Sequence, residues 1–146
     1  MVSAEKNSIV LHKLANDLVL LGEIKKTTKS AAIGFFVGTG SRDELVSEVG
    51  VSHFLEHMMF KGSAKRSAID LTYALGAIGA QANAFTSEEN TVFYGAVLPE
   101  YFSAMQEILS HMLRPALLTE EFDTEKKVIL EEIALYEDRP DRKSVV

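Results

Sequence analysis

The sequence predicts an α+β fold, an antiparallel-rich sheet with helices packed on one face. Two observations predict it. The first third of the chain consists of short apolar, β-leaning runs separated by turn residues, and most of the remainder shows helical periodicity around one further pair of strands. With 146 residues, 47% of them hydrophobic and 25% charged, the chain is expected to form one domain, 1–146, with a hydrophobic core.

Strands are expected first. The runs "SIVLHKL" (8–14) and "LVLLGEI" (18–24) flank the short polar segment "AND", which is typical of a turn. A third apolar run, "SAAIGFFVG" (30–38), leads into a loop rich in glycine and serine. Later in the chain, "QANAFTS" (81–87) and "TVFYGAV" (91–97) predict a hairpin.

Four helices are expected between and after these strands. Their ends carry standard signals: a cation followed by glycine at a C-terminus, a capping box, proline at the first position, and a threonine N-cap. The expected helices are 51–60, a short one opened by Ser67, one that runs from Pro99 to before Pro115, and a long one capped by Thr119.

Charge and composition narrow the function classes. The net charge of −6 argues against nucleic acid, which needs a basic face. The absence of cysteine excludes disulfides and thiolate ligands, so any metal must be held by histidines and carboxylates. No apolar stretch reaches the roughly 18 residues that span a bilayer, and the N-terminus lacks the pattern of a signal peptide. We therefore expect a cytoplasmic protein without nucleic-acid or membrane partners.

The segment "VSHFLEHMMF" (51–60) looks like the buried turns of a helix, yet it contains two histidines and a glutamate. An unpaired ionisable group is costly in such a place. At about 100° per residue, His53 and His57 lie within about 40° of each other, and Glu56 lies about 60° from His53. Two imidazoles with a carboxylate beside them suit Zn²⁺, and the spacing is that of the HxxEH motif of inverzincins.

The last helix offers the third ligand that such a zinc site needs. Helical periodicity puts Glu125 and Glu132 on its apolar stripe, whereas Glu131 falls on the opposite, solvent-facing side. If the two helices pack together, His53, His57 and Glu132 surround a metal and leave one position open for water.

Other interpretations stay open at this point. Histidines on an apolar face are more often satisfied core residues than ligands, so His53 and His57 could pack without metal in a purely structural domain. A buried ion pair or a half-exposed stripe edge explains Glu125 nearly as well as a role near a metal. The ionisable residues on both helices together favour the metal site.

Three segments carry a resemblance to a known family. "GVSHFLEHMMFKGS", "NAFTSEENTVFYGAVLPE" and "EKKVILEEIALYED" resemble the insulinase/pitrilysin family of zinc metallopeptidases, and within it the bacterial relatives of the mitochondrial processing peptidase β-subunit. Glu132 lies 75 residues after His57 and seven after Glu125, as the family pattern requires. The resemblance implies a truncated αβ-roll half-domain that lacks its C-terminal part and the second half of the protein.

The resemblance also implies roles for individual residues. Glu56 would be the general base, and Glu125 would support the site without binding metal. Asn83 and Ala84 match the edge strand along which family members bind an extended substrate. One Zn²⁺ per chain would be held by His53, His57 and Glu132.

The predicted function is that of a zinc-dependent endopeptidase cleaving peptides or unfolded, extended segments by metal-activated water, with Glu56 as the base. The alternative is a zinc- and peptide-binding fragment or subunit that is inactive alone. Truncation would expose sheet edges and a helix face, so we expect a homo-oligomer, a complementary C-terminal half or a partner subunit to cover them.

Overall fold

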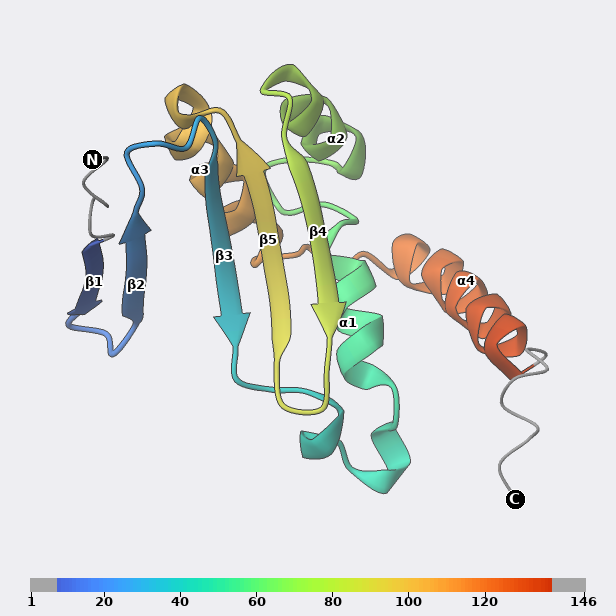
Figure 1. Ribbon diagram of the computed structural model, residues 1–146. Coiled ribbons are helices and arrows are strands. Elements are labelled where there is room, and N and C mark those ends of the chain that lie inside the picture. Colours follow the sequence, from blue (N-terminus) through green and yellow to red (C-terminus); the bar gives the residue numbers. More distant parts are fainter. Residues whose placement is uncertain (1–7, 138–146) are drawn as a thin grey trace.

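The computed structural model describes residues 8–137, which form two antiparallel sheets and four α-helices (Figure 1). Strands β1 (Ser8–Lys13) and β2 (Val19–Ile24) form a hairpin. The second sheet has the order β3-β5-β4. Its strands are β3 (Ala31–Val37), β4 (Gln81–Thr86) and β5 (Thr91–Val97). The predicted α+β class and the predicted hairpin of β4 and β5 are confirmed.

The N-terminal hairpin differs from the single sheet that was expected. Strands β1 and β2 pair only with each other, so the hairpin forms a sheet of its own beside β3 (Figure 1). Its apolar side chains stay largely in solvent: Leu11 is 70% exposed and Leu21 is 73% exposed. Hydrophobic alternation predicted the strands but did not determine which strand they would pair with.

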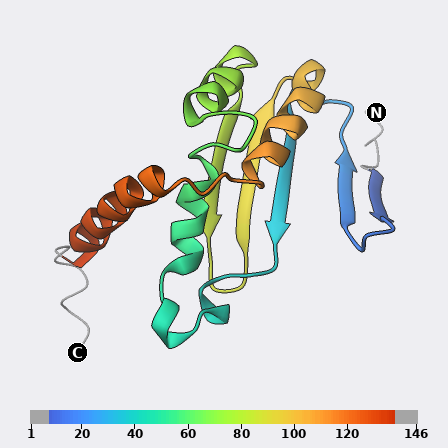
Figure 2. The ribbon, with the colours of Figure 1, turned by 180° about the vertical axis from the view of Figure 1, so that it is seen from behind.

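Three helices cover one face of the larger sheet (Figures 1 and 2). They are α1 (Val51–Met59), α2 (Ala68–Ala77) and α3 (Phe102–Met112). Ser67 caps α2 as predicted, in a reciprocal capping box with Asp70. A 3₁₀ turn at Pro99–Tyr101 precedes α3. The layered arrangement of helices on one face is therefore confirmed.

The core lies between this sheet and helices α2 and α3. Helix α3 presents Met105, Leu109 and Met112 on one face, and these side chains pack with Leu71 of α2 and Val97 of β5. Gly95 of β5 leaves room for Met105, because the end of the Met105 side chain occupies the place that a Cβ at position 95 would take. The core thus fixes the sheet and leaves α1 at its margin.

Helix α1 is less buried than its sequence suggested. Met58 is fully buried, but Val51 and Leu55 are each 39% exposed. The reason is its position: α1 packs on β4 on one side and on α4 (Thr119–Glu137) on another, so only part of its circumference is covered (Figure 2). Within residues 8–137, no helix is both long enough and apolar enough to cross a membrane.

Candidate metal centre

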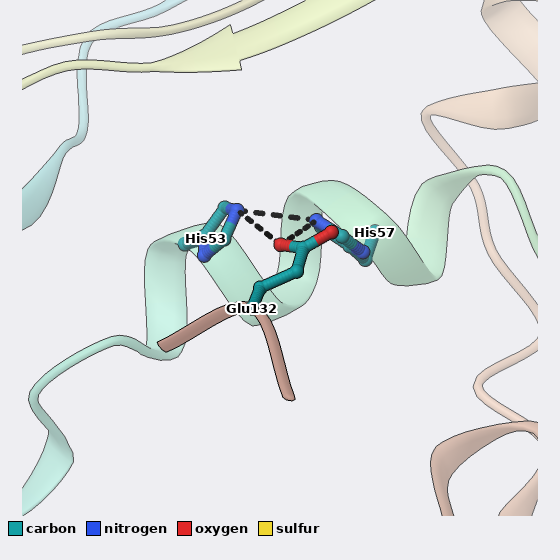
Figure 3. A group of neighbouring side chains, drawn as sticks. All are labelled: His53, His57 and Glu132. Carbon is teal, nitrogen blue, oxygen red and sulfur yellow. Dashed lines mark hydrogen bonds and ion pairs between the residues drawn. The ribbon is translucent and has the colours of Figure 1, made fainter. Parts of the chain in front are cut away.

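Helices α1 and α4 bring two histidines and a glutamate together (Figure 3). His53 and His57 lie one turn apart on α1, and their Nε2 atoms are 3.1 Å from each other. Oε2 of Glu132, on α4, lies 4.0 Å from His53 Nε2 and 3.8 Å from His57 Nε2. The ligand atoms of all three residues fall within 4.8 Å of one another.

This geometry and chemistry fit a zinc ion. Zinc–ligand distances of about 2.0–2.1 Å in a tetrahedron place neighbouring ligand atoms about 3.3 Å apart, close to the observed spacings. Two histidines and a glutamate form a known catalytic zinc set, in which a fourth position stays open. The side chains of His53 and Glu132 are 42% and 39% exposed, so that position can be reached from solvent.

Glu125 fixes the orientation of one histidine. His57 Nδ1 donates a hydrogen bond of 2.7 Å to Glu125 Oε1, because a carboxylate can only accept. The neutral His57 ring then has its lone pair on Nε2, the atom that faces His53 and Glu132. Glu125 therefore contacts a candidate ligand, and its own carboxylate is not among the atoms that converge.

Glu125 is also one half of a buried ion pair. Its residue is only 3% exposed, and Lys61 Nζ contacts its Oε2 atom. Burial alone would raise the pKa of the Glu125 carboxyl, but the hydrogen bonds from Lys61 and His57 lower that pKa below its ordinary value. The structure has the buried ion pair that the sequence left open, whereas an exposure of 3% contradicts the half-exposed stripe edge. The role of Glu125 near a metal stays a prediction. The sequence did not indicate the contact of Lys61 with Glu125, because Lys61 lies just beyond the end of α1 and the two residues are far apart in the chain.

Glu56 lies near this group but outside it. Its carboxylate is not among the atoms that converge within 4.8 Å. Instead, the hydroxyl of Thr86, the last residue of β4, donates a hydrogen bond of 2.5 Å to Glu56 Oε2. Thr86 was not singled out from the sequence, because the hydrogen bond joins residues 30 positions apart.

The segment before α1 holds this helix in place. Glu44 accepts hydrogen bonds from the backbone N–H groups of Gly50 (2.7 Å) and Ser52 (2.8 Å), at the N-terminus of α1. A carboxylate is favoured there by the unpaired amides and the helix dipole. Burial opposes the charge, yet these hydrogen bonds keep the pKa of the Glu44 carboxyl below its ordinary value.

The same segment also binds the tip of the β4–β5 hairpin. The N–H groups of Ser41 and Arg42 donate to the carbonyls of Ser87 (3.0 Å) and Glu88 (2.9 Å). Gly40 allows this close approach, since a Cβ there would collide with the backbone of Ser87 and Glu88. One short segment, 40–44, therefore connects the end of β4 to the start of α1.

Asn83 and Ala84 lie on β4, which is an edge strand of its sheet. They pair with Tyr94 and Phe93 of β5, and no other described strand pairs with β4. The Ala84 N–H donates to Asn83 Oδ1 at 2.9 Å. The structure thus places both residues on a free strand edge that leads to Thr86.

Comparison with known proteins adds independent evidence. A family model described as "Insulinase (Peptidase family M16)" matches residues 19–146. The uncharacterized zinc protease YmxG of Bacillus subtilis is 43% identical over 127 residues, which cover 86% of this chain. An uncharacterized zinc protease of Rickettsia felis is 38% identical over 137 residues, or 93% of the chain. The mitochondrial-processing peptidase subunit beta of Saccharomyces cerevisiae is 40% identical over 121 residues, or 82%.

The matched region is a minor part of each of these relatives. It spans 31% of the Bacillus protein, 33% of the Rickettsia protein and 26% of the yeast subunit.

Proposed function

Because the chain belongs to the insulinase family of peptidases, family M16, we propose that it carries the zinc centre of a metalloendopeptidase. The substrates are peptides or extended, unfolded segments of proteins. The observation that carries the proposal is the convergence of His53, His57 and Glu132 from two helices on one point. The names of the relatives, which include several zinc proteases, support the same metal.

In this proposal His53, His57 and Glu132 hold one zinc ion per chain. When bound, zinc lowers the pKa of water and polarises the scissile carbonyl. The neutral His57 tautomer required for ligation is maintained by Glu125, which accepts the Nδ1–H and is itself balanced by Lys61.

Glu56 moves the proton. Its carboxylate accepts a proton from the water that attacks the scissile carbonyl and then donates that proton to the leaving amine. One proton is taken and one is returned, so the carboxylate is regenerated in each cycle. The hydrogen bond from Thr86 occupies one of its oxygens, Oε2, and leaves Oε1 for this work.

The substrate lies along the free edge of β4. An extended peptide can add to an exposed edge strand through backbone hydrogen bonds, which read shape rather than sequence. The Ala84 N–H donates to the Asn83 side chain in the absence of substrate. When a substrate strand binds, the Asn83 amide rotates away and the Ala84 N–H donates to the substrate backbone instead. The edge runs toward Thr86 and hence toward Glu56.

A second candidate function follows from the share of the relatives that the chain spans. At 31% of the length of the Bacillus relative, the chain would bind zinc and peptide but need a complementary half or partner subunit for turnover. Exposed apolar side chains are consistent with such an arrangement or with self-association. Those on α4 include Leu130, at 57% exposed, and Leu135, at 68% exposed.

The test is hydrolysis of a quenched fluorescent peptide library by the zinc-loaded chain, with Glu56→Gln as the variant and Glu131→Gln as the matched control. Glu131 is exposed and adjacent to Glu132, so its replacement changes charge near the site without touching it. Activity that a chelator abolishes, and that only Glu56→Gln lacks, supports the endopeptidase. One bound zinc without activity supports the second candidate, and a chain that binds no zinc rejects both.

A further inference from the structure

Glu56 occupies a position on α1 from which it could become a metal ligand. It precedes His57 directly and lies about 60° around the helix from His53, so its side chain starts beside the two imidazoles. Carboxylate oxygens bind zinc at about 2.0–2.2 Å, and a fourth protein ligand would close the position that a catalytic site must leave open. A base at this position must therefore be kept away from the metal.

The structure contains a contact that keeps it away. The Thr86 hydroxyl donates to Glu56 Oε2 at 2.5 Å, a short bond to a charged acceptor, and both side chains are partly buried. The Glu56 carboxylate is directed toward β4 by this bond and stands outside the group formed by the three candidate ligands.

Segment 40–44 and the β4–β5 turn together hold the elements that carry Thr86 and Glu56. Thr86 pairs with Thr91 at the close of the β4–β5 ladder, and the Ser87 N–H donates to the Asn90 carbonyl at 2.8 Å across the turn. Segment 40–44 binds this turn through its backbone and binds the N-terminus of α1 through Glu44. These contacts hold the end of β4, which carries Thr86, and the start of α1, the helix of Glu56, in a fixed relation to each other.

We infer that Thr86 is a positioning residue, whose hydroxyl holds the Glu56 carboxylate out of the coordination sphere of the metal and available as the base. The inference rests on the proposed zinc centre and deepens it. Thr86 touches neither metal nor substrate in this role. Serine supplies the same hydroxyl, whereas valine keeps the β-branched shape of threonine and removes the hydroxyl.

Cobalt(II) provides a test that does not depend on catalysis, because its visible absorption is sensitive to the type and arrangement of the ligands around the ion. The unsubstituted chain and Thr86→Ser should give the same intense four-coordinate spectrum. Thr86→Val should give a changed spectrum and bind cobalt about tenfold more tightly, or about 1.4 kcal/mol, as the Glu56 carboxylate takes the fourth position in place of water. Adding Glu56→Gln to Thr86→Val should remove both changes, and Thr86→Ala repeats the test if valine packs poorly.

The outcomes separate this inference from the proposed function. Cobalt binding with an unchanged spectrum and affinity in Thr86→Val overturns the role of Thr86 and leaves the metal centre intact. The same holds if the changes persist in the double variant, since Glu56 would not cause them. A chain that binds no cobalt rejects the metal centre and the inference with it. Where peptide hydrolysis is measurable, Thr86→Val should lower kcat with little change in KM, and Thr86→Ser should recover it.

Discussion

Replacement of Glu125 by glutamine changes the charge behind His57 while keeping the size of the side chain. In the unsubstituted chain, His57 Nδ1 lies 2.7 Å from Glu125 Oε1. The glutamine oxygen of the variant can still accept this hydrogen bond, but as a neutral acceptor. Hydrogen bonds to charged groups contribute about 1.5–3 kcal/mol, against about 0.5–1.5 kcal/mol for neutral ones. Lys61, whose side chain is 30% exposed, can turn to water when its partner is lost, so it adds little to this difference.

The weaker hydrogen bond to His57 Nδ1 in Glu125→Gln should lower the affinity of the chain for zinc. Groups that hydrogen-bond a metal-ligating histidine typically change metal affinity by about 10- to 100-fold, consistent with the difference between charged and neutral bonds. We therefore expect Glu125→Gln to bind zinc about 10- to 100-fold more weakly, which corresponds to about 1.4–2.7 kcal/mol.

The assay is competition with a zinc-binding indicator at fixed pH and ionic strength. Glu131→Gln is the control, because it removes the same charge from an exposed position of the same helix. An affinity of Glu125→Gln within about twofold of the Glu131→Gln control, well below the effect expected, would show that Glu125 does not orient the ligand.

Three further outcomes are expected. Glu44→Gln should lower the free energy of unfolding in urea by about 1 kcal/mol, through weaker capping of α1. Because folding lowers the pKa of the Glu44 carboxyl, its contribution is present above the unfolded-state pKa of about 4.3 and is lost as pH falls through the lower folded-state pKa. The variant should lack that component of acid sensitivity, and equal acid profiles would contradict this account. Met58→Ala should cost about 2–5 kcal/mol in the same urea measurement, since Met58 is fully buried, whereas Val51→Ala should cost less than about 1 kcal/mol. Removal of zinc by a chelator should increase hydrogen exchange in α4 more than in β3, β4 and β5, because zinc would join α4 to α1; equal increases would argue against a metal shared by the two helices.

The sequence predicted features that arise from local periodicity. The 3.6-residue repeat was enough to place His53 and His57 on one face, and the same repeat put Glu132 rather than Glu131 toward them. Capping signals predicted the start of α2 at Ser67, and the structure has that capping box. Each of these depends on residues within two turns of one another, where backbone geometry fixes the relation.

The features that were missed depend on contacts between distant segments. Thr86 lies 30 residues from Glu56, and Lys61 lies 64 residues from Glu125, so no periodic pattern links them. Glu44 looked like part of a polar loop, although it caps a helix that starts seven residues later. The partial exposure of α1 likewise follows from its place at the margin of the sheet, which apolar composition alone does not reveal.

The two glutamates of α4 lie at opposite nitrogens of the same imidazole. The spacing along the helix therefore sets where both carboxylates stand relative to the His57 ring. Glu125 bonds His57 Nδ1 and Glu132 faces His57 Nε2, and the two glutamates are seven positions, or about 10.5 Å of helix, apart. An insertion of one residue in this interval would rotate Glu132 by about 100° and carry it out of reach, while Glu125 stayed in place. Of the six residues between them, only Ile129 is buried. The candidate site therefore depends on the number of residues between Glu125 and Glu132, whereas the identities of most of these residues are free to vary.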